Sequence, residues 1–268
     1  MRPWVTAAYD GLNKKKPGEF RNVTPRRLTD QIGGLFELTP SERSALRRLE
    51  ERERVVRRGQ PLLRENDRST DLFFLIGGQM MSYVLLDDGS RQILRFLFPG
   101  DVLATAAIGY ATSPETLVAL SESTVCAIDR AQLVPLAREH PRLLLAIAAL
   151  EQAERAALID RLANVGRTSA KARVAAVMLD IRDRMRRGDP SIGDSFVLGL
   201  TQEEVGDATG LTAVHVNRML RALEDERLIA RAAGRVTFLD ERMLRRVANY
   251  VDRMTGIDLS WIPAPAEE

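Results

Sequence analysis

The stretch LTQEEVGDATGLTAVHVNRMLRAL, residues 200–223, decides the fold of the C-terminal part of this chain. Thr201 and Glu204 have the spacing of a capping box, so a short helix is expected to begin directly after Thr201. Gly210 predicts the end of that helix, because glycine adopts a left-handed turn without steric cost. Thr212 is a suitable cap for a second helix. The stretch therefore predicts two short helices joined by a tight turn, as in a helix-turn-helix.

The spacing of the hydrophobic residues predicts a shared core between these two helices. The inward positions are Val205, Leu211, Val216, Met219, Leu220 and Leu223. Gly206 lies one turn before Gly210 and predicts a close approach of the second helix. The next residues, RLIARAAGRVTFLD at 227–240, predict two short strands around Ala232-Ala233-Gly234, which is the pattern of a wing.

The face of the second helix that points away from this core is free to enter a DNA major groove. We expect seven residues to form the DNA-binding surface: Thr212, Ala213, Val214, His215, Asn217, Arg218 and Arg221. Arg218 is the first choice for base readout, because a guanidinium donates to both O6 and N7 of guanine. Asn217 has the groups to pair with adenine or to bind a phosphate. Thr212, His215 and Arg221 are better placed for the DNA backbone.

Residues 55–128 differ from this region, because short β-rich runs alternate there with turn residues. Asp87-Asp88-Gly89-Ser90 joins two of these runs and predicts a hairpin. Pro99-Gly100-Asp101 predicts another turn. Short strands at this spacing favour an antiparallel β-roll that is similar to a jelly roll. The fold class expected for the whole chain is therefore α+β.

A long helix is predicted between the two parts, from Pro141 to about Gly166. Apolar residues recur along this helix at helical spacing and form a stripe. We expect this stripe to pack on a second copy of the chain through Ile147, Leu150, Glu154, Leu158, Leu162 and Val165. A core helix of a monomer is the alternative. Glu151 and Glu154 interrupt the stripe. If they face the second copy, their carboxylates repel each other and disfavour the dimer unless they are protonated or bind a ligand. The alternative is that both side chains point to solvent.

These features together resemble the Crp/Fnr family of bacterial transcription regulators. The runs GQPLLREND, LFFLIGGQM and FPGDVL and the hairpin at 87–90 resemble the family's β-roll effector domain, and residues 136–166 its dimerisation helix. The resemblance covers about residues 35–240 and implies a homodimer that binds a two-fold-related DNA site, with RNA polymerase as a further partner. The family also has a base-contacting arginine at the position of Arg218. It often has polar residues where this chain has Ala213 and Val214, which offer methyl contacts to thymine instead.

Five segments follow from this organisation: a flexible N-terminal tail (1–30), a β-roll sensor domain (31–135), a dimerisation helix (136–166), a winged helix-turn-helix domain (167–240) and a C-terminal helical extension with a tail (241–268). The formal net charge is +2, made of +4 over residues 1–30, −2 over 31–166, +3 over 167–256 and −3 over the rest. A mildly basic C-terminal part is compatible with phosphate binding and equally with an ordinary solvated surface.

The expected effector pocket of the roll comprises Leu103, Ala104, Thr105, Glu115 and Thr116. Members of the family that bind cyclic nucleotides have a Gly-Glu pair and an Arg-Ser or Arg-Thr pair there. This chain has Leu103-Ala104-Thr105 and Pro114-Glu115 instead, and an acidic group in place of the phosphate-binding arginine repels an anion. Cyclic AMP is therefore a poor candidate. The roll is left with an unknown, uncharged or lipophilic small molecule as effector, or with none.

Composition excludes several other functions. One cysteine, Cys126, excludes a per-chain iron–sulfur cluster, and with two histidines it cannot form a Cys/His zinc site without carboxylates. No cofactor, metal site or catalytic residue is expected. A cupin-type metalloenzyme needs several histidines inside the roll, and residues 55–128 contain none. A ligand-binding adaptor that does not bind DNA remains the alternative function.

Cys126 is expected to be a small buried hydrophobe rather than a redox thiol. His140, directly before Pro141, is either a helix-boundary residue or a haem ligand. No apolar run is long enough for a membrane span, and the first residues do not have the pattern of a secretory signal. The chain is accordingly expected to be a cytoplasmic protein without a membrane partner.

Overall fold

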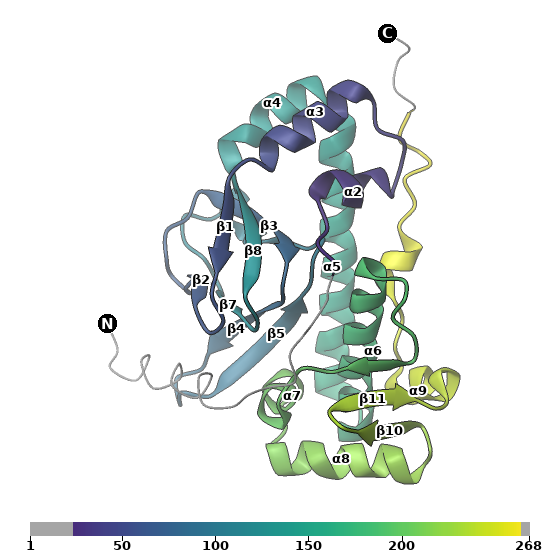
Figure 1. Cartoon of the computed structure of the whole chain (residues 1–268). Coiled ribbons are helices and arrows are strands. Elements are labelled where there is room, and N and C mark those ends of the chain that lie inside the picture. The colour runs from purple at the N-terminus through teal and green to yellow at the C-terminus, as the bar shows by residue number, and fades with distance from the viewer. Residues whose placement is uncertain (1–23, 264–268) are drawn as a thin grey trace.

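A computed structural model describes residues 24–263, and Figure 1 shows its arrangement. The N-terminal domain contains the strands β1 (Glu53–Val56), β2 (Pro61–Leu63), β3 (Asp71–Gly77), β4 (Met80–Leu85), β5 (Arg91–Leu97), β6 (Val102–Leu103), β7 (Thr116–Ala119) and β8 (Ser123–Asp129). They form two antiparallel sheets with the orders β1-β8-β3-β6 and β2-β7-β4-β5. The predicted antiparallel roll is confirmed.

Apolar side chains from both sheets fill the interior of the roll. Leu75 and Leu103 of the first sheet are fully buried with Leu97 and Leu117 of the second. The predicted hairpin joins β4 to β5: Gly89 has a φ of 83°, and the amide of Leu86 donates to the carbonyl of Ser90 at 2.9 Å. The turn residues and the alternating apolar positions therefore specify the same register.

Three short helices pack over one end of the roll: α2 (Leu28–Gly33), α3 (Pro40–Leu49) and α4 (Leu133–Glu139). Helix α3 begins with a capping box, in which Thr39 and Glu42 exchange hydrogen bonds of 2.9 and 3.1 Å. Helix α2 begins inside the range predicted as a flexible tail, and its Leu28 is buried. Residues 1–23 and 264–268 of the predicted tails lie outside the described residues.

The long helix α5 (Pro141–Arg167) lies between the roll and the C-terminal domain (Figure 1). His140 separates it from α4 and has a φ of −135°, which places this residue at a helix boundary. Helix α6 (Ala170–Gly188) follows after Thr168 and Ser169, and the hydroxyl of Ser169 caps its first turn.

The C-terminal domain contains β9 (Ser195–Val197), α7 (Gln202–Thr209), α8 (Ala213–Asp225), β10 (Ile229–Ala232), β11 (Arg235–Phe238) and α9 (Glu241–Ala248). The three strands form an antiparallel sheet in the order β10-β11-β9. Ala233 and Gly234 both have positive φ values at the tip between β10 and β11. The predicted winged helix-turn-helix is confirmed, and with it the α+β class.

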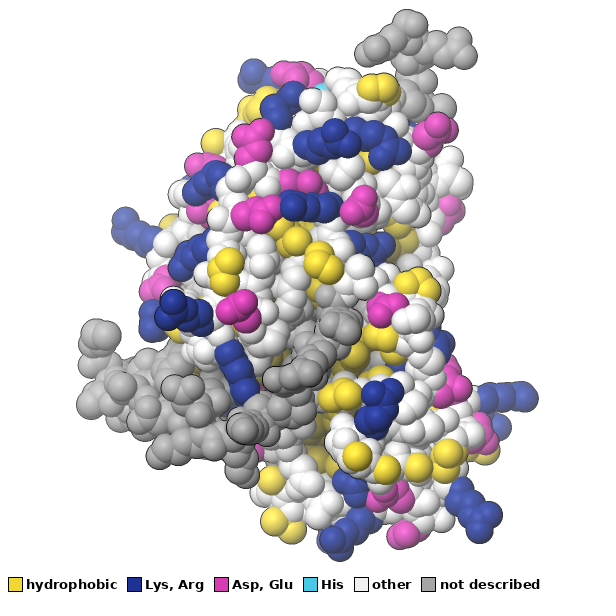
Figure 2. Space-filling model, viewed as in Figure 1, with side chains coloured by type: hydrophobic (Ala, Val, Ile, Leu, Met, Phe, Trp, Pro, Cys, Tyr) yellow, Lys and Arg dark blue, Asp and Glu magenta, His cyan; other side chains and the backbone are white. Residues whose placement is uncertain are grey.

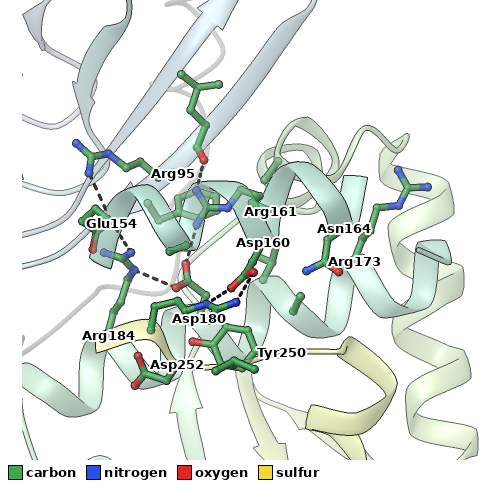
Figure 3. Close-up of a pocket in the computed structure, with 18 of the residues that line it drawn as sticks. Arg95, Glu154, Asp160, Arg161, Asn164, Arg173, Asp180, Arg184, Tyr250 and Asp252 are labelled. Carbon is green, nitrogen blue, oxygen red and sulfur yellow. Dashed lines mark hydrogen bonds and ion pairs between the residues drawn. The ribbon is translucent and has the colours of Figure 1, made fainter. Parts of the chain in front are cut away.

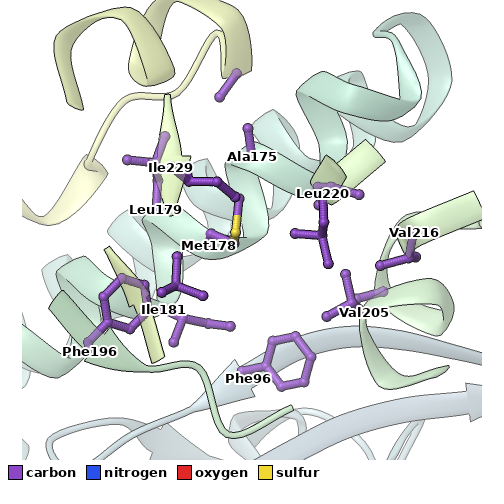
Figure 4. Close-up of a cluster of buried hydrophobic side chains, with 14 of the residues drawn as sticks. Phe96, Ala175, Met178, Leu179, Ile181, Phe196, Val205, Val216, Leu220 and Ile229 are labelled. Atoms are coloured by element: carbon purple, nitrogen blue, oxygen red, sulfur yellow. The ribbon is translucent and has the colours of Figure 1, made fainter. Parts of the chain in front are cut away.

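The roll packs directly on the C-terminal domain. Figure 4 shows Phe96 of β5 pointing into a cluster with Met178 and Ile181 of α6 and Val205 of α7. An ion pair between Arg91 of β5 and Asp207 of α7, 2.6 Å between nitrogen and oxygen, lies beside this cluster. The sequence does not predict this contact, because each partner alone has the pattern of an ordinary surface or core residue.

Residues 249–263 return from the C-terminal domain along α5 to α2 (Figure 1). Arg253 of this C-terminal segment forms two hydrogen bonds with Asp160 of α5, at 2.5 and 2.7 Å. Further along, Leu259 and Ile262 are buried in the cluster that contains Leu28. The segment therefore joins both domains. Over residues 24–263, none of the helices combines the length and the apolar character that crossing a membrane requires.

Candidate nucleic-acid interface

The helix-turn-helix forms through the local contacts that its sequence predicts. The amide of Thr201 donates to Glu204 at 2.7 Å, and the amide of Glu204 donates back to the Thr201 hydroxyl at 3.1 Å. Gly210 ends α7 with a φ of 67°. A Cβ on Gly206 would lie 2.4 Å from the carbonyl oxygen of Leu211, so no larger residue fits between the two helices. These contacts define the angle at which α8 leaves the turn.

The inward face of α8 is anchored in the domain core. Val216, Leu220 and Leu223 are buried, and Figure 4 shows Val216 and Leu220 facing Val205 of α7. The remaining predicted core residues, Leu211 and Met219, are half-buried and pack against the same cluster. The outward face of α8 consequently has a defined orientation.

The seven predicted DNA-binding residues lie at the start and along the outward face of α8. Thr212, Val214, Arg218 and Arg221 are exposed, with Val214 at 81%, while Ala213, His215 and Asn217 are half-buried. The hydroxyl of Thr212 accepts a hydrogen bond from the amide of His215, so this side chain also caps α8. The structure thus places all seven on one continuous surface.

Arg218 has a partner that the sequence reasoning missed. Its Nη2 lies 2.9 Å from Nε2 of His215, one helical turn earlier. A guanidinium only donates hydrogen bonds, so Nε2 accepts and a neutral ring has its proton on Nδ1. Their spacing of three residues on a helix is the signal in the sequence that could have identified this contact.

The wing is held against α8 by side chains. Arg231 of β10 forms an ion pair with Glu224 near the end of α8, at 2.6 Å. Arg235 of β11 donates to the carbonyl oxygen of Ser195 at 2.7 Å and so joins β9 to the wing.

On the face of the molecule that Figure 2 shows, Lys and Arg side chains are interspersed with acidic ones at both ends, so charge on this face does not by itself define the DNA surface.

Two of the predicted effector residues, Leu103 and Thr116, lie in strands of the two sheets, and the other three lie in the segments next to these strands. Leu103 of β6 and Ala104 are buried in the apolar interior, and Thr105 is half-buried at the next position. Glu115 is half-buried, and the Thr116 hydroxyl accepts a hydrogen bond of 3.0 Å from the amide of Glu65. Leu103 and Ala104 therefore contribute to core packing, whereas Thr105 and Glu115 keep accessible polar groups.

The six predicted pairing residues of α5 divide into two groups. Leu158 and Leu162 are 40% and 75% exposed, and Ile147 and Val165 are half-buried. Leu150 and Glu154 are buried, because this part of α5 packs against its own chain on this side. The expectation that Glu154 faces either a second copy or solvent is therefore wrong.

Glu154 belongs to a buried group of charges between the roll, α5 and α6. Its carboxylate contacts Nη2 of Arg184 at 2.8 Å and Nη1 of Arg95 at 3.5 Å. Burial raises the pKa of this carboxyl, but Arg184 and Arg95 outweigh it and lower the pKa to about 2. Asp101 also pairs with Arg184, at 3.0 Å, but there burial prevails and raises the pKa. Arg95 stands within the apolar run of β5, and a charged side chain in a buried strand requires a charged partner. This position is the signal from which sequence analysis could have predicted a buried ion pair.

Glu151 lies one helical turn from Glu154 and is half-buried. Burial raises the pKa of Glu151, while Arg95 and a hydrogen bond from the Thr105 side chain act in the opposite direction.

Cys126 is fully buried, its Sγ contacts the carbonyl oxygen of Leu49 at 3.1 Å, and burial raises the pKa of its thiol to about 11. Such a thiol is a poor nucleophile at neutral pH.

Comparison with known proteins agrees with both domains. Residues 53–140 match the cyclic nucleotide-binding domain and residues 172–247 the Crp-like helix-turn-helix domain. The chain is 32% identical over 191 residues to the nitrogen fixation regulation protein FixK of Bradyrhizobium diazoefficiens, covering 71% of this chain and 79% of that protein. It is 30% identical over 213 residues to the transcriptional activatory protein AadR of Rhodopseudomonas palustris, covering 79% and 87%.

Solved structures show the same fold. The structure of FixK2 from Bradyrhizobium japonicum matches with a TM-score of 0.65 and 23% identity, covering 73% of this chain and 96% of that one. These relatives are transcription regulators and not enzymes. Sequence motifs, fold and relatives agree, and the chain belongs to the Crp/Fnr family of transcription regulators.

Proposed function

We propose that a homodimer of this chain binds a two-fold-related DNA site in the cytoplasm and regulates transcription there, through RNA polymerase or by occlusion. Helix α8 carries this proposal. Its inward face is buried, the turn before it is closely packed at Gly206, and Arg218 is exposed on its outward face with His215 as partner. A guanidinium presented in this way matches the O6 and N7 acceptors of guanine in the major groove.

His215 acts on Arg218 rather than on DNA bases in this proposal. The hydrogen bond to Nε2 restrains one side of the guanidinium, which leaves its other N–H groups to the DNA. Asn217 lies beside Arg218 for a contact to adenine or phosphate, and Thr212 and Arg221 contact the DNA backbone. Ala213 and Val214 present methyl groups to thymine.

Arg218→Ala is expected to weaken binding to the specific site by about 1–3 kcal/mol while the dimer stays intact. A genome-wide selection of bound DNA fragments with the purified protein identifies the site, and a titration of that site with both proteins measures the loss. Arg138→Ala is the matched control, because this exposed arginine lies on α4 at the far end of the molecule from α8. Unchanged affinity of Arg218→Ala for the selected site would exclude the proposed base contact.

The dimer is proposed from the exposed side of α5. Leu145, Leu158, Ile159 and Leu162 expose 39%, 40%, 57% and 75% of their surface along this 27-residue helix. Large apolar side chains that recur on one helix are costly in water and are typical of a helix-pairing surface. A second copy supplies the same face, as a two-fold axis requires.

Cyclic AMP is expected to leave the affinity for the selected DNA site unchanged, even in the millimolar range. Glu115 stands in the sequence where the family's cyclic nucleotide-binding members have the phosphate-binding arginine, and a carboxylate there would repel the phosphate. Calorimetry with cyclic AMP and the protein, followed by DNA titration with and without the nucleotide, measures this. A clear increase in DNA affinity would contradict our interpretation of the roll. An iron–sulfur cluster is not proposed either, since the chain has one cysteine.

A further inference from the structure

A pocket lies where α5, α6, β5 and the C-terminal segment meet (Figure 3). Its cavity volume is about 60 Å³, and the space it encloses together with the part that opens to solvent is about 800 Å³. The pocket is separate from the outward face of α8 and from the predicted effector residues of the roll. Its position at the joint between the long helix and the C-terminal domain makes its occupant relevant to the orientation of α8.

Two polar side chains of this pocket have groups without a hydrogen-bond partner within residues 24–263. Asn164 of α5 is only 8% exposed, and its side-chain amide forms no hydrogen bond with another residue of this range. Arg173 of α6 has a buried Nε without a hydrogen-bond partner. Its Nη1 donates to the carbonyl of Thr209 at 2.7 Å, and no described carboxylate pairs with it. Buried polar atoms normally have partners, so the unpartnered Nε of Arg173 beside the free amide of Asn164 indicates a ligand.

The charge of that ligand follows from the other arginines around the pocket. Each has a carboxylate partner: Arg95 and Arg184 pair with Glu154, Arg161 with Asp180, Arg187 with Asp252 and Arg253 with Asp160. Arg173 differs from them because it keeps an unneutralised positive charge. An anion would pair with this guanidinium, and Asn164 would donate its amide N–H to the same anion.

The apolar part of the ligand follows from the walls. Ala157 and Val165 of α5 and Ala176 and Val177 of α6 are apolar residues that line the pocket. In the view of Figure 3, Asn164 and Arg173 lie at one end of the pocket, away from Glu154. We propose that this pocket binds a small organic carboxylate, with its carboxylate on Arg173 and Asn164 and its apolar body between α5 and α6.

Tyr250 of the C-terminal segment closes another side of the pocket. Burial raises the pKa of its phenol, so the hydroxyl remains a hydrogen-bond donor at neutral pH. A ligand here would touch α5, α6 and the C-terminal segment together, and would favour one angle between α5 and α6. Binding itself is independent of DNA, whereas an effect on DNA affinity rests on the proposed function.

Calorimetric titration of the full chain with hexanoate and benzoate, each compared with its neutral amide, tests the proposal. The carboxylates and their amides have the same apolar bodies and differ in charge. At least one carboxylate is expected to bind once per chain, at least tenfold more tightly than its amide, which corresponds to about 1.4 kcal/mol. Equal dissociation constants for acid and amide, or no binding of either carboxylate, would overturn it.

Variants locate the site. Arg173→Gln keeps a donor for Thr209 but removes the charge, and is expected to weaken carboxylate binding about tenfold. Asn164→Leu fills the same end of the pocket and is expected to abolish binding. Arg138→Gln on α4 removes an exposed arginine elsewhere and should leave the dissociation constant unchanged, and circular dichroism confirms folding of each variant. Carboxylate binding that survives both pocket variants places it outside this pocket. DNA titration without carboxylate tests the proposed function separately.

Discussion

Glu154→Gln is expected to lower the free energy of unfolding by about 3–5 kcal/mol, the usual cost of removing one partner from a buried ion pair. The carboxylate lies between Arg184 and Arg95, and within residues 24–263 it is the one carboxylate paired with Arg95, whereas Arg184 also contacts Asp101 and Asp180. Glutamine has nearly the same shape, so the loss reports charge rather than packing. Urea denaturation of both proteins at neutral pH measures it.

The pH dependence of this difference gives a second measurement. The pKa of Glu154 is lowered from 4.5 to about 2 in the folded chain. The carboxylate therefore contributes its full share to the free energy of unfolding above pH 4.5, and this share is lost as the pH falls towards 2. Asp101 has a raised pKa and protonates earlier, which leaves Glu154 and Asp180 as the carboxylates that neutralise Arg184. The stability gap between the two proteins should therefore narrow over that interval.

Glu139→Gln is the matched control, because Glu139 is an exposed carboxylate at the end of α4. Its free energy of unfolding should stay within about 0.5 kcal/mol of the unchanged protein. A loss for Glu154→Gln no larger than that of this control would mean that the buried charges do not stabilise the fold.

Replacing Ile159 and Leu162 together by glutamate is expected to convert the proposed homodimer into monomers and to weaken binding to the proposed two-fold DNA site at least hundredfold. Both side chains are exposed on α5, so the substitutions leave the core of the chain intact. In a two-fold pair the four new carboxylates lie close together and repel each other. A hundredfold loss corresponds to about 2.8 kcal/mol.

Analytical ultracentrifugation measures the assembly, and titration with a full site and a half site separates loss of pairing from damage to α8. The affinity for the half site should be unchanged. Val134→Glu is the control, because Val134 is 53% exposed on α4, away from the proposed interface. A dimer that persists in the double variant would show that another surface joins the copies.

Local sequence determined the DNA-reading unit almost completely. Thr201, Glu204, Gly206 and Gly210 act within one or two turns of the chain, so their caps and close contacts could be predicted from spacing. The same holds for the hairpin at Asp87–Ser90 and for the wing tip at Gly234. Each depends on φ preference or on a hydrogen bond between near neighbours, which neighbouring residues specify.

Only the tertiary structure decided which sides of α5 are covered. Apolar periodicity identifies the helix and assigns both Leu150 and Leu162 to one pairing stripe, but Leu150 is buried while Leu162 is exposed. Glu154 and Arg184 are 30 residues apart and meet only because α5 and α6 pack together. Burial of a charge depends on partners from distant segments, and neither their distance nor their number follows from residue order.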